Sequence, residues 1–295
     1  MIRVPVRTEV LMGTIVTIQV VCDDSDEAID RAFGWFHEIE SRCSRFDEHS
    51  ELVQLSMQVG VPVPVSPILF EAVRFALRVS EETAGAFDPT VGLRMESRGF
   101  DREHWTGRAV RTPLSPNEDV SYRDIEIDAH ERTITLHKPL LLDLGSVAKG
   151  LAVDAAAREL QPFHDFAIDA GGDLYLGGHN PRGVPWVVGI RHPRMDGAVI
   201  DWFSISDGAV CTSGDYERLA SNGVTHILDP RSGASAALSA SVTVLAPTAL
   251  AADALATAAF VLGPAEGLGL LVRHGAEGLI VTPALDRYET PGLHR

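Results

Sequence analysis

The segment that most constrains the fold of this chain is an alanine-rich run near the C-terminus, residues 247–262, which reads PTALAADALATAAFVL. Gly263 ends this run, and Pro264 begins a further helical stretch that reaches Arg273. A helix with alanine, leucine, phenylalanine and valine almost all round has no polar face to turn towards water, so it has to be buried. Burial requires other elements around it, and 295 residues can supply them in one large or two ordinary domains.

The rest of the chain alternates between helical and strand-like patterns. Helices are expected at residues 24–46, where Asp24 and Glu27 have capping-box spacing, at residues 67–85, which begin with proline, and at residues 147–160. Strands are expected at the β-branched or apolar runs 8–21, 124–127, 133–137, 140–144, 166–168, 186–190, 200–205, 209–212, 226–228, 241–245 and 278–282. Helices interspersed with hairpin-like strands predict an α+β fold rather than a regular β-α-β series.

Two breaks in this pattern carry information of their own. Residues 12–14, MGT, interrupt the first expected strand, and a glycine inside a strand indicates a bulge or a close approach to a ligand. Residues 99–120 are polar and contain two prolines and several glycines or charged residues, so we expect a loop or a boundary there.

The charge balance restricts the partners that the chain can bind. It has 25 Lys and Arg against 41 Asp and Glu, a net charge of −16. This balance argues against a nucleic-acid partner, because such binding depends on basic side chains that neutralise phosphates, and it disfavours anionic membrane surfaces for the same reason. The three cysteines, Cys22, Cys43 and Cys211, are odd in number and form no CxxC pair, which argues against a disulfide framework or a zinc site.

The N-terminal sequence gives no targeting signal. It lacks the apolar segment and small-residue cleavage site of a signal peptide, and no cysteine of the lipoprotein kind lies near the start. No run of about 18 uninterrupted apolar residues is present, so we expect no membrane-spanning segment. The chain as it stands is therefore expected in the cytoplasm, and in an exported form if a leader has been removed.

Polar side chains inside the alanine-rich run are the first candidates for chemistry. Asp253 and Thr257 stand four residues apart, which places a carboxylate and a hydroxyl on one helix face. Hard cations such as Mg²⁺ prefer oxygen ligands, and a buried carboxylate needs a partner or a metal. A metal site is one interpretation, and an ordinary polar helix face is the other.

Four further motifs are ambiguous when each is taken alone. Residues 143–150, DLGSVAKG, join a short apolar run to a helix, so they fit either a phosphate cradle assisted by Lys149 or an ordinary turn. DAGGD at residues 169–173 and AFDPTVG at residues 86–92 indicate turns. His226 in HILDPRSG suits acid–base chemistry near neutral pH, or a structural role.

The order of these motifs along the chain resembles the ApbE-type FAD:protein FMN transferase family. The resemblance is carried by MGT (12–14), AFDPTVG (86–92), DLGSVAKG (143–150), DAGGD (169–173), TSGDYE (212–217), HILDPRSG (226–233), SVTVLAPTALAADALAT (241–257) and FVLG (260–263). It implies one ApbE-like domain over residues 5–290, with two intimately associated subdomains of mixed or antiparallel sheet, flanking helices and a flavin cleft between them. It also implies Mg²⁺-dependent transfer of FMN from FAD to a Thr or Ser hydroxyl of an acceptor protein, with release of AMP.

The resemblance assigns roles to individual positions. For a divalent cation, Mg²⁺ or Mn²⁺, it implies ligands at Ser146, Asp253, Ala256 and Thr257. For FAD, it implies contacts from Met12, Phe46, Ala86, Phe87, Asp88, Asp143, Lys149 and Leu228. His226 matches the position of a proposed catalytic histidine, and Asp143 is the rival base. The partner it implies is an acceptor protein with an exposed Thr-containing flavinylation motif.

Two positions depart from the family pattern. Gly145 and Ser146 replace a common Gly-Gly pair, and Phe46 stands where a flavin-stacking tyrosine is frequent. Phenylalanine preserves stacking but loses the phenolic hydrogen bond. An FAD diphosphatase that produces FMN and AMP, and a non-enzymatic FAD-binding protein, are therefore alternative functions.

Overall fold

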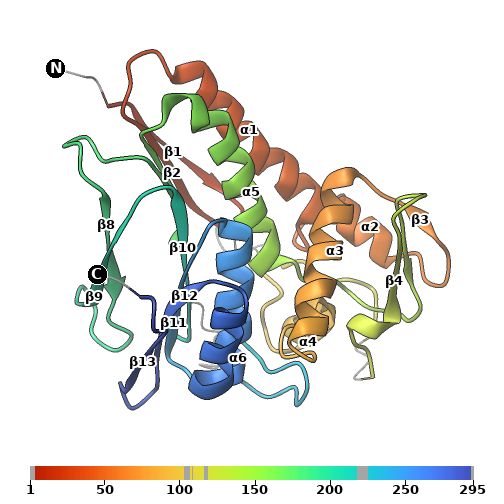
Figure 1. Cartoon of the computed structure of the whole chain (residues 1–295). Helices are drawn as coiled ribbons and strands as arrows, with labels where there is room; N and C mark the ends of the chain where they lie inside the picture. Colours follow the sequence, from red (N-terminus) through yellow and green to blue (C-terminus); the bar gives the residue numbers. More distant parts are fainter. Residues whose placement is uncertain (1–3, 103–106, 108, 116–118, 218–224, 294–295) are drawn as a thin grey trace.

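The structure is a computed structural model that describes residues 4–102, 107, 109–115, 119–217 and 225–293. Its largest element is a sheet of eight antiparallel strands. Helices cover one face of this sheet, as Figure 1 shows: α1 (Asp26–Cys43), α5 (Gly145–Leu160) and α6 (Ala249–Arg273). The strand order is β1 (Val6–Leu11), β2 (Thr14–Val20), β6 (Phe166–Ala170), β7 (Asp173–Gly177), β10 (Gly208–Gly214), β11 (Ser241–Ala246), β12 (Glu277–Val281) and β13 (Arg287–Glu289).

Helix α6 is the buried helix that the alanine-rich run predicts. It packs against α5 and against β10, β11 and β12. The backbone leaves the helical region at Gly263, where φ is 75°, directly before Pro264, so the expected break is present. α6 is the one helix among the described residues that is long and apolar enough to cross a membrane, but 56% of its apolar window is buried inside the protein. Its composition is therefore accounted for by its place in the core.

Two residues of α5 set the position of α6. Gly150 lies at the crossing of the helices, where a Cβ atom would stand 2.6 Å from the Ala249 carbonyl oxygen and from the Leu250 Cα. One turn further on, the buried Asp154 carboxylate accepts hydrogen bonds from the Ala249 N–H (2.7 Å) and the Leu250 N–H (3.0 Å). These bonds satisfy N–H groups at the start of α6 that have no partner within the helix. Close approach and capping together fix which α6 residues face the first turn of α5.

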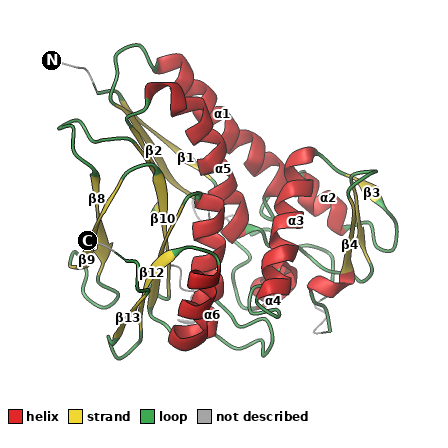
Figure 2. Cartoon of the chain, in the orientation of Figure 1, coloured by secondary structure: helices red, strands yellow, loops and turns green. Residues whose placement is uncertain are grey.

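A smaller subdomain packs beside the helical layer, on the right in Figure 2. It consists of the helices α2 (Glu51–Ser56), α3 (Pro67–Glu82) and α4 (Gly92–Ser97) and a three-stranded sheet in the order β3 (Val63–Pro64), β5 (Thr133–Leu136), β4 (Ile125–Asp128). β4 and β5 form the hairpin expected from the sequence. Together with the antiparallel main sheet, this arrangement confirms the predicted α+β fold.

The hairpin of β8 (Trp186–Arg191) and β9 (Val199–Ile205) packs on the other face of the main sheet. Its buried Ile190 and Phe203 meet Leu279 and Val281 of β12 in a separate small core. Ile280 lies between them in sequence and belongs to the main core instead. This division follows from the alternation of side chains along a strand.

The expected single strand over residues 8–21 is a hairpin. Met12 and Gly13 both have positive φ values, 52° and 69°, and form a two-residue turn between Leu11 and Thr14. Two successive residues with positive φ match the right-handed twist of the paired strands and reverse the chain. The glycine thus marks a chain reversal and not a bulge.

Three other local predictions are wrong. The four leucines of residues 140–144 are buried but form no strand, because this segment runs along the residues before α4, where the Asp143 N–H donates to the Pro89 carbonyl oxygen at 2.7 Å. Residues 226–228 contribute only an isolated bridge at Leu228. Helix α1 begins after Ser25 with no side-chain cap, so the expected capping box is absent. Within the predicted loop 99–120, residues 103–106, 108 and 116–118 lie outside the described residues.

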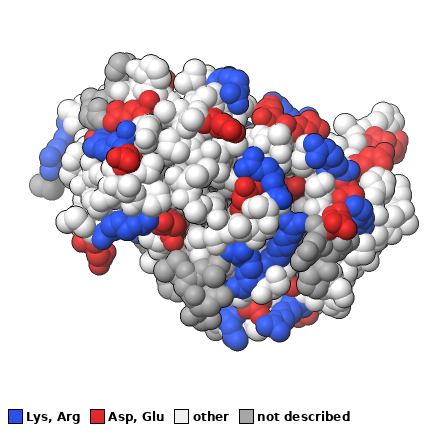
Figure 3. Space-filling model, turned by 90° about the horizontal axis from the view of Figure 1, so that it is seen from below, with Lys and Arg blue, Asp and Glu red and all other residues white. Residues whose placement is uncertain are grey.

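Charge is unevenly distributed over the surface. The chain carries a large excess of acidic residues. On the face seen from below in Figure 3, where α4 and the lower end of α6 lie, basic side chains nevertheless gather in a band. Acidic side chains also lie on this face, around the basic band.

Candidate functional site

A cavity of about 1080 Å³ lies between the two subdomains, and most of the sequence motifs meet in it. The smaller subdomain contributes Phe87 and Met95 to its wall, and the main subdomain contributes Thr212. Ligand cavities commonly measure about 300–1000 Å³, so this one is large enough for a dinucleotide. Nearly all the side chains expected at the site line it: Met12, Phe46, Ala86, Phe87, Asp88, Asp143, Ser146, Lys149, His226, Leu228, Asp253 and Thr257.

Two tight turns form one edge of the cavity. The Met12 N–H of the β1–β2 turn donates to Glu40 Oε1 of α1 at 2.9 Å. Gly171, in the turn between β6 and β7, has a φ of 68°, and a Cβ atom there would stand 1.9 Å from Thr14 Oγ1. Only glycine fits this conformation and this contact. The MGT and DAGGD motifs are thus in contact although more than 150 residues separate them.

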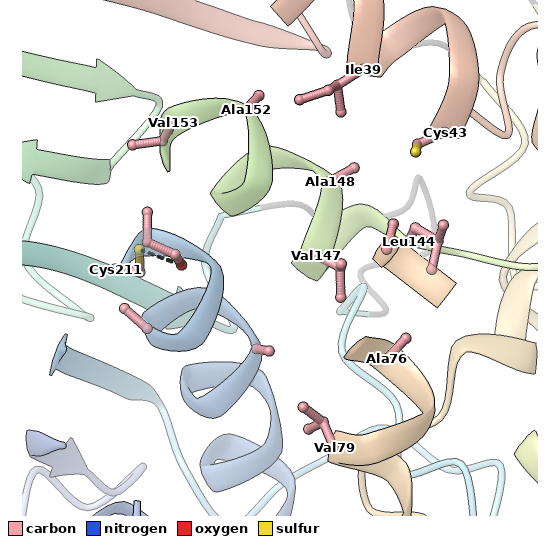
Figure 4. Packing of buried hydrophobic residues seen from close by; sticks show 14 of the residues in the cluster. Ile39, Cys43, Ala76, Val79, Leu144, Val147, Ala148, Ala152, Val153 and Cys211 are labelled. Atoms are coloured by element: carbon pink, nitrogen blue, oxygen red, sulfur yellow. Dashed lines mark hydrogen bonds between the residues drawn. The ribbon is translucent and has the colours of Figure 1, made fainter. Parts of the chain in front are cut away.

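Helix α5 turns its irregular first turn towards the cavity. Gly145, Ser146 and Lys149 line the cavity, while Val147 and other apolar residues of α5 pack in the core between α1, α3 and α6 (Figure 4). The backbone of Ser146 departs from helical geometry, with φ −90° and ψ 16°. The Lys149 ammonium forms an ion pair with the buried Asp173 carboxylate. A helix N-terminus that faces a cavity in this way favours anionic groups.

A group of oxygen atoms lies where α5, α6 and β10 meet. Thr257 Oγ1 is 3.0 Å from Ser146 Oγ and 3.2 Å from Ser213 Oγ. Asp253, one helical turn before Thr257, is 6% exposed and lines the same cavity. The side chains that face one another here therefore offer one carboxylate and three hydroxyls.

This donor set is suited to a hard cation. Mg²⁺ is commonly held by one or two carboxylates together with substrate phosphates and water. Within the described parts of the chain, no three His, Cys, Asp or Glu side chains come together to hold a metal ion. A cation in this cavity would therefore depend on Asp253, on hydroxyl and main-chain oxygens, and on the oxygens of its substrate.

Arg45 is a site residue that the sequence patterns do not reveal. Its side chain is 6% exposed, and its Nε donates to Asp143 Oδ2 at 2.8 Å. Its guanidinium carbon lies 4.0 Å from the centroid of the Phe46 ring, in a cation–π contact. Asp143 Oδ1 accepts a second hydrogen bond, from the Gly145 N–H at 2.9 Å. One buried cation thus connects the aromatic wall of the cavity with the loop before α5.

Asp88 builds the loop that leads into α4. Its Oδ1 accepts hydrogen bonds from the N–H (2.9 Å) and the hydroxyl (2.7 Å) of Thr90, and its Oδ2 accepts one from the Tyr122 N–H (2.9 Å). Burial is the main cause that raises the pKa of this carboxyl, and the hydrogen bonds oppose it. Both Asp88 oxygens therefore already accept hydrogen bonds from groups of the protein itself.

The loop that carries His226 is fastened to the smaller subdomain. Arg94 of α4 donates to the Pro230 carbonyl oxygen at 2.6 Å, and Arg98 donates to the Gly233 carbonyl oxygen at 2.9 Å. The ring of Phe100 meets the His226 imidazole edge-on, with centroids 6.4 Å apart. α4 and the residues directly after it thus hold the imidazole at the wall of the cavity.

Comparisons with known proteins place this geometry in a family. The sequence profile described as the ApbE family matches residues 12–280. This chain belongs to the ApbE family. It is 32% identical over 278 residues to the FAD:protein FMN transferase of Haemophilus influenzae, covering 87% of this chain and 80% of that protein. It is also 32% identical over 244 residues to the Escherichia coli K12 protein of the same name, covering 78% and 69% of the two chains.

Solved structures of the ApbE family have the same fold. The ApbE protein of Thermotoga maritima superposes with a TM-score of 0.86 at 30% identity, over 98% of this chain and 97% of that one. The flavin transferase ApbE of Vibrio cholerae superposes with a TM-score of 0.85 at 27% identity, over 99% and 98% of the two chains. The likeness therefore extends over both subdomains.

Within this ApbE chain, the structure separates the expected site residues into those that face the cavity and one that does not. Ala256 is fully buried inside α6 and offers only a main-chain oxygen, so its role as a metal ligand stays a prediction. The DAGGD motif predicts only a turn at Asp173, whereas the Asp173 carboxylate forms an ion pair with Lys149. No motif indicates Arg45, whereas the acidic residue that ends DAGGD is the available signal for Asp173.

Proposed function

We propose that this protein transfers the FMN moiety of FAD to a Thr or Ser hydroxyl of an acceptor protein and releases AMP. The observation that carries the proposal is the meeting of the family motifs around one cavity large enough for FAD. The two curated relatives described above are named FAD:protein FMN transferases, which supports the proposal. An exposed Thr-containing segment is the acceptor that we expect.

The reaction makes and breaks one bond at phosphorus. The acceptor hydroxyl oxygen attacks the FMN-side phosphorus of FAD and forms a phosphoester. The bond from that phosphorus to the bridging oxygen breaks, and AMP leaves with the electron pair. The hydroxyl proton passes to a base, for which we propose His226, because it lines the cavity and an imidazole accepts protons near neutral pH.

Other side chains bind and orient the substrates. Phe46 offers a ring for stacking against the flavin, and the first turn of α5 with Lys149 receives the diphosphate. Asp143 was the rival base, but both of its oxygens accept hydrogen bonds, from Arg45 and Gly145. We therefore assign Asp143 the task of holding the loop before α5 in place.

We also propose that the reaction requires Mg²⁺, or Mn²⁺ in its place. Asp253, Thr257 and Ser146 would hold the cation, with a main-chain oxygen of Ala256 as a further ligand. A cation held there would supply positive charge to offset the charge of the diphosphate. A chain with a net charge of −16 needs such local compensation to accept a polyanionic substrate.

A time course with FAD and Mg²⁺, with and without a Thr-containing acceptor peptide, tests the proposal. We expect AMP release that depends on the peptide and a peptide mass increased by one FMN phosphoester. AMP and free FMN without peptide would identify a diphosphatase instead, and unchanged FAD in both reactions would refute both enzymatic functions.

Two variants distinguish the metal site from general effects of charge removal. Asp253→Ala should abolish turnover and the Mg²⁺-induced rise in melting temperature, with the protein still folded. Asp286→Ala removes an exposed carboxylate between β12 and β13 and should change neither quantity. Full activity of the Asp253→Ala variant would show that the metal assignment is wrong.

A further inference from the structure

An ion pair joins the wall of the cavity to the core behind it. Lys149 lines the cavity, and its ammonium pairs with the Asp173 carboxylate. The Lys149 side chain is 22% exposed, whereas the Asp173 side chain is 4% exposed and does not line the cavity. Of the two partners, the lysine is therefore the one that can reach a bound substrate.

The fold holds the Asp173 carboxylate in a fixed position. Asp173 is the first residue of β7 and pairs with Ala170 of β6 across a turn of two glycines, Gly171 and Gly172. Both glycines have positive φ values, 68° and 96°, which reverse the chain in register with the paired strands. β7 lies between β6 and β10 inside the main sheet, and α5 packs against it. The aspartate therefore has little freedom to move, because its main chain belongs to an inner strand.

The lysine side chain, in contrast, is flexible by nature. A lysine carries its charge on a four-carbon stem, so fixing the ammonium costs rotamer entropy. The ion pair with Asp173 orders the Lys149 stem before a substrate arrives, and such preorganisation strengthens binding. An ammonium has three N–H donors, so it can contact a carboxylate and a phosphate oxygen at the same time.

Two other polar groups lie close to the ion pair. The Asp169 carboxylate, at the other end of the turn, accepts a hydrogen bond from the Gly172 N–H at 2.8 Å. The Cys211 thiol of β10 lies beside Asp173 and is turned towards the start of α6, as Figure 4 shows. Burial raises the pKa of this thiol, and the Asp173 charge raises it further, so the thiol is neutral. Lys149, and not Cys211, is therefore the charged partner of Asp173.

We propose that Asp173 is a positioning residue, which holds the Lys149 ammonium against the diphosphate of FAD. The inference rests on the proposed transferase function, because that function brings a diphosphate to the first turn of α5. Asp173 acts through the lysine and not on the substrate, since its own side chain is buried behind the ammonium. It orders the ammonium before FAD binds and keeps it in place while negative charge develops on the departing AMP.

A double-mutant cycle of Asp173→Asn and Lys149→Met tests this proposal through FAD binding, followed by flavin fluorescence without acceptor. Asp173→Asn keeps the shape of the side chain and should raise the FAD dissociation constant about threefold to tenfold, the cost of ordering one long side chain on binding. In the Lys149→Met background the same substitution should leave this constant unchanged or lower it, because the Asp173 carboxylate without its lysine repels the diphosphate. Weakening by the same factor in both backgrounds would overturn the proposal.

Riboflavin distinguishes positioning from a general change of the cavity. It has the flavin ring and the ribityl chain but no phosphate, so its affinity should be the same for wild type and for Asp173→Asn. Equal losses of affinity for FAD and for riboflavin would show that Asp173 shapes the cavity as a whole, and would overturn the proposal.

An aspartate near the other end of β7 supplies the matched control. Asp207 is exposed and accepts a hydrogen bond from the Gly178 N–H at 2.8 Å, so Asp207→Asn makes the same change and should alter neither affinity. Should Asp173→Asn not fold, Asp173→Ser gives the same comparison with a smaller neutral side chain. Equal FAD binding by that folded variant and by the wild type would refute the positioning role.

Turnover with a Thr-containing acceptor peptide gives an independent measure. Asp173→Asn should lower kcat and raise the KM for FAD, because the ammonium also supports the charge of the departing AMP, whereas the KM for the peptide should not change. A changed peptide KM with normal FAD parameters would contradict the proposal. Failure of the transferase function would appear differently, as no AMP release from the wild type while the cycle in FAD binding still shows coupling.

Discussion

Replacement of Arg45 by alanine tests the inference that one buried cation holds two walls of the cavity together. The variant removes the hydrogen bond to Asp143 and the stacking contact with Phe46. Loss of one partner of a fully buried ion pair costs about 3–5 kcal/mol, because the other charge stays buried and unpaired. Asp143 is 20% exposed, so water can reach it, and we expect the free energy of unfolding to fall by about 2–3 kcal/mol.

The same change should weaken FAD binding. The contact between the Arg45 guanidinium and the Phe46 ring orients the ring, and such a contact contributes about 0.5–2 kcal/mol. Its loss should raise the FAD dissociation constant by about tenfold, which equals about 1.4 kcal/mol. Arg45→Lys keeps the charge but loses the planar fork, so both effects should be intermediate.

Urea unfolding and a flavin fluorescence titration measure the two effects. Arg78→Ala is a suitable control, because Arg78 is 70% exposed and lies 3.8 Å from Glu82, so its removal should cost less than about 1 kcal/mol. If the Arg45→Ala protein is no less stable than this control and binds FAD as the wild type does, the coupling of Phe46 and Asp143 through Arg45 is refuted.

Four other measurements test further parts of the structure. Thr257→Val removes the hydroxyl that faces Ser146 while keeping the side-chain volume, and should lower Mg²⁺-dependent turnover at least about tenfold without lowering the melting temperature. Normal turnover would contradict the assignment of Thr257 as a metal ligand. Gly150→Ala places a methyl group 2.6 Å from an α6 carbonyl oxygen and should cost about 1–3 kcal/mol in urea unfolding, and no cost would disprove the close crossing. Burial raises the pKa of Asp154 above its ordinary 3.8, so its contribution to stability is fully present below pH 3.8 and is lost as pH rises through the folded-state pKa; Asp154→Asn should flatten this fall in a pH series of unfolding curves. Burial raises the pKa of Cys43 to about 12, so at pH 8 a thiol reagent should leave it unmodified and react first with the partly exposed Cys22, and the thiol's contribution to stability should fall only between pH 9 and 12.

Local patterns predicted the long helices well. Helix α3 begins at Pro67, behind the N-cap Ser66, and α6 bends at Gly263, both as expected. Periodicity over four or more turns and a proline at the first helical position act within a few residues, so they can be read directly from the chain. The short elements α2, α4, β7 and β13 were not expected, because three to six residues carry too little periodicity to stand out from a loop.

The strand prediction was wrong for a buried apolar run that forms its hydrogen bonds outside any sheet. Residues 140–142 are fully buried, as a strand would be, yet the Leu141 carbonyl oxygen accepts a hydrogen bond from the Gly92 N–H at the start of α4. Conversely, the Asp173–Gly177 strand begins at a residue that looked like part of a turn. Burial can be inferred from composition, but which neighbour completes the hydrogen bonds depends on the assembled sheet.

The sequence by itself determined that α6 is buried, that Asp253 and Thr257 share a helix face, and that the chain carries the ordered motifs of the ApbE family. Each of these properties depends on residue types at short spacing. Only the tertiary structure decided that Arg45 pairs with Asp143 and that Lys149 pairs with Asp173. Such contacts join segments far apart in the chain, and the packing of the two subdomains, not any local pattern, brings them together.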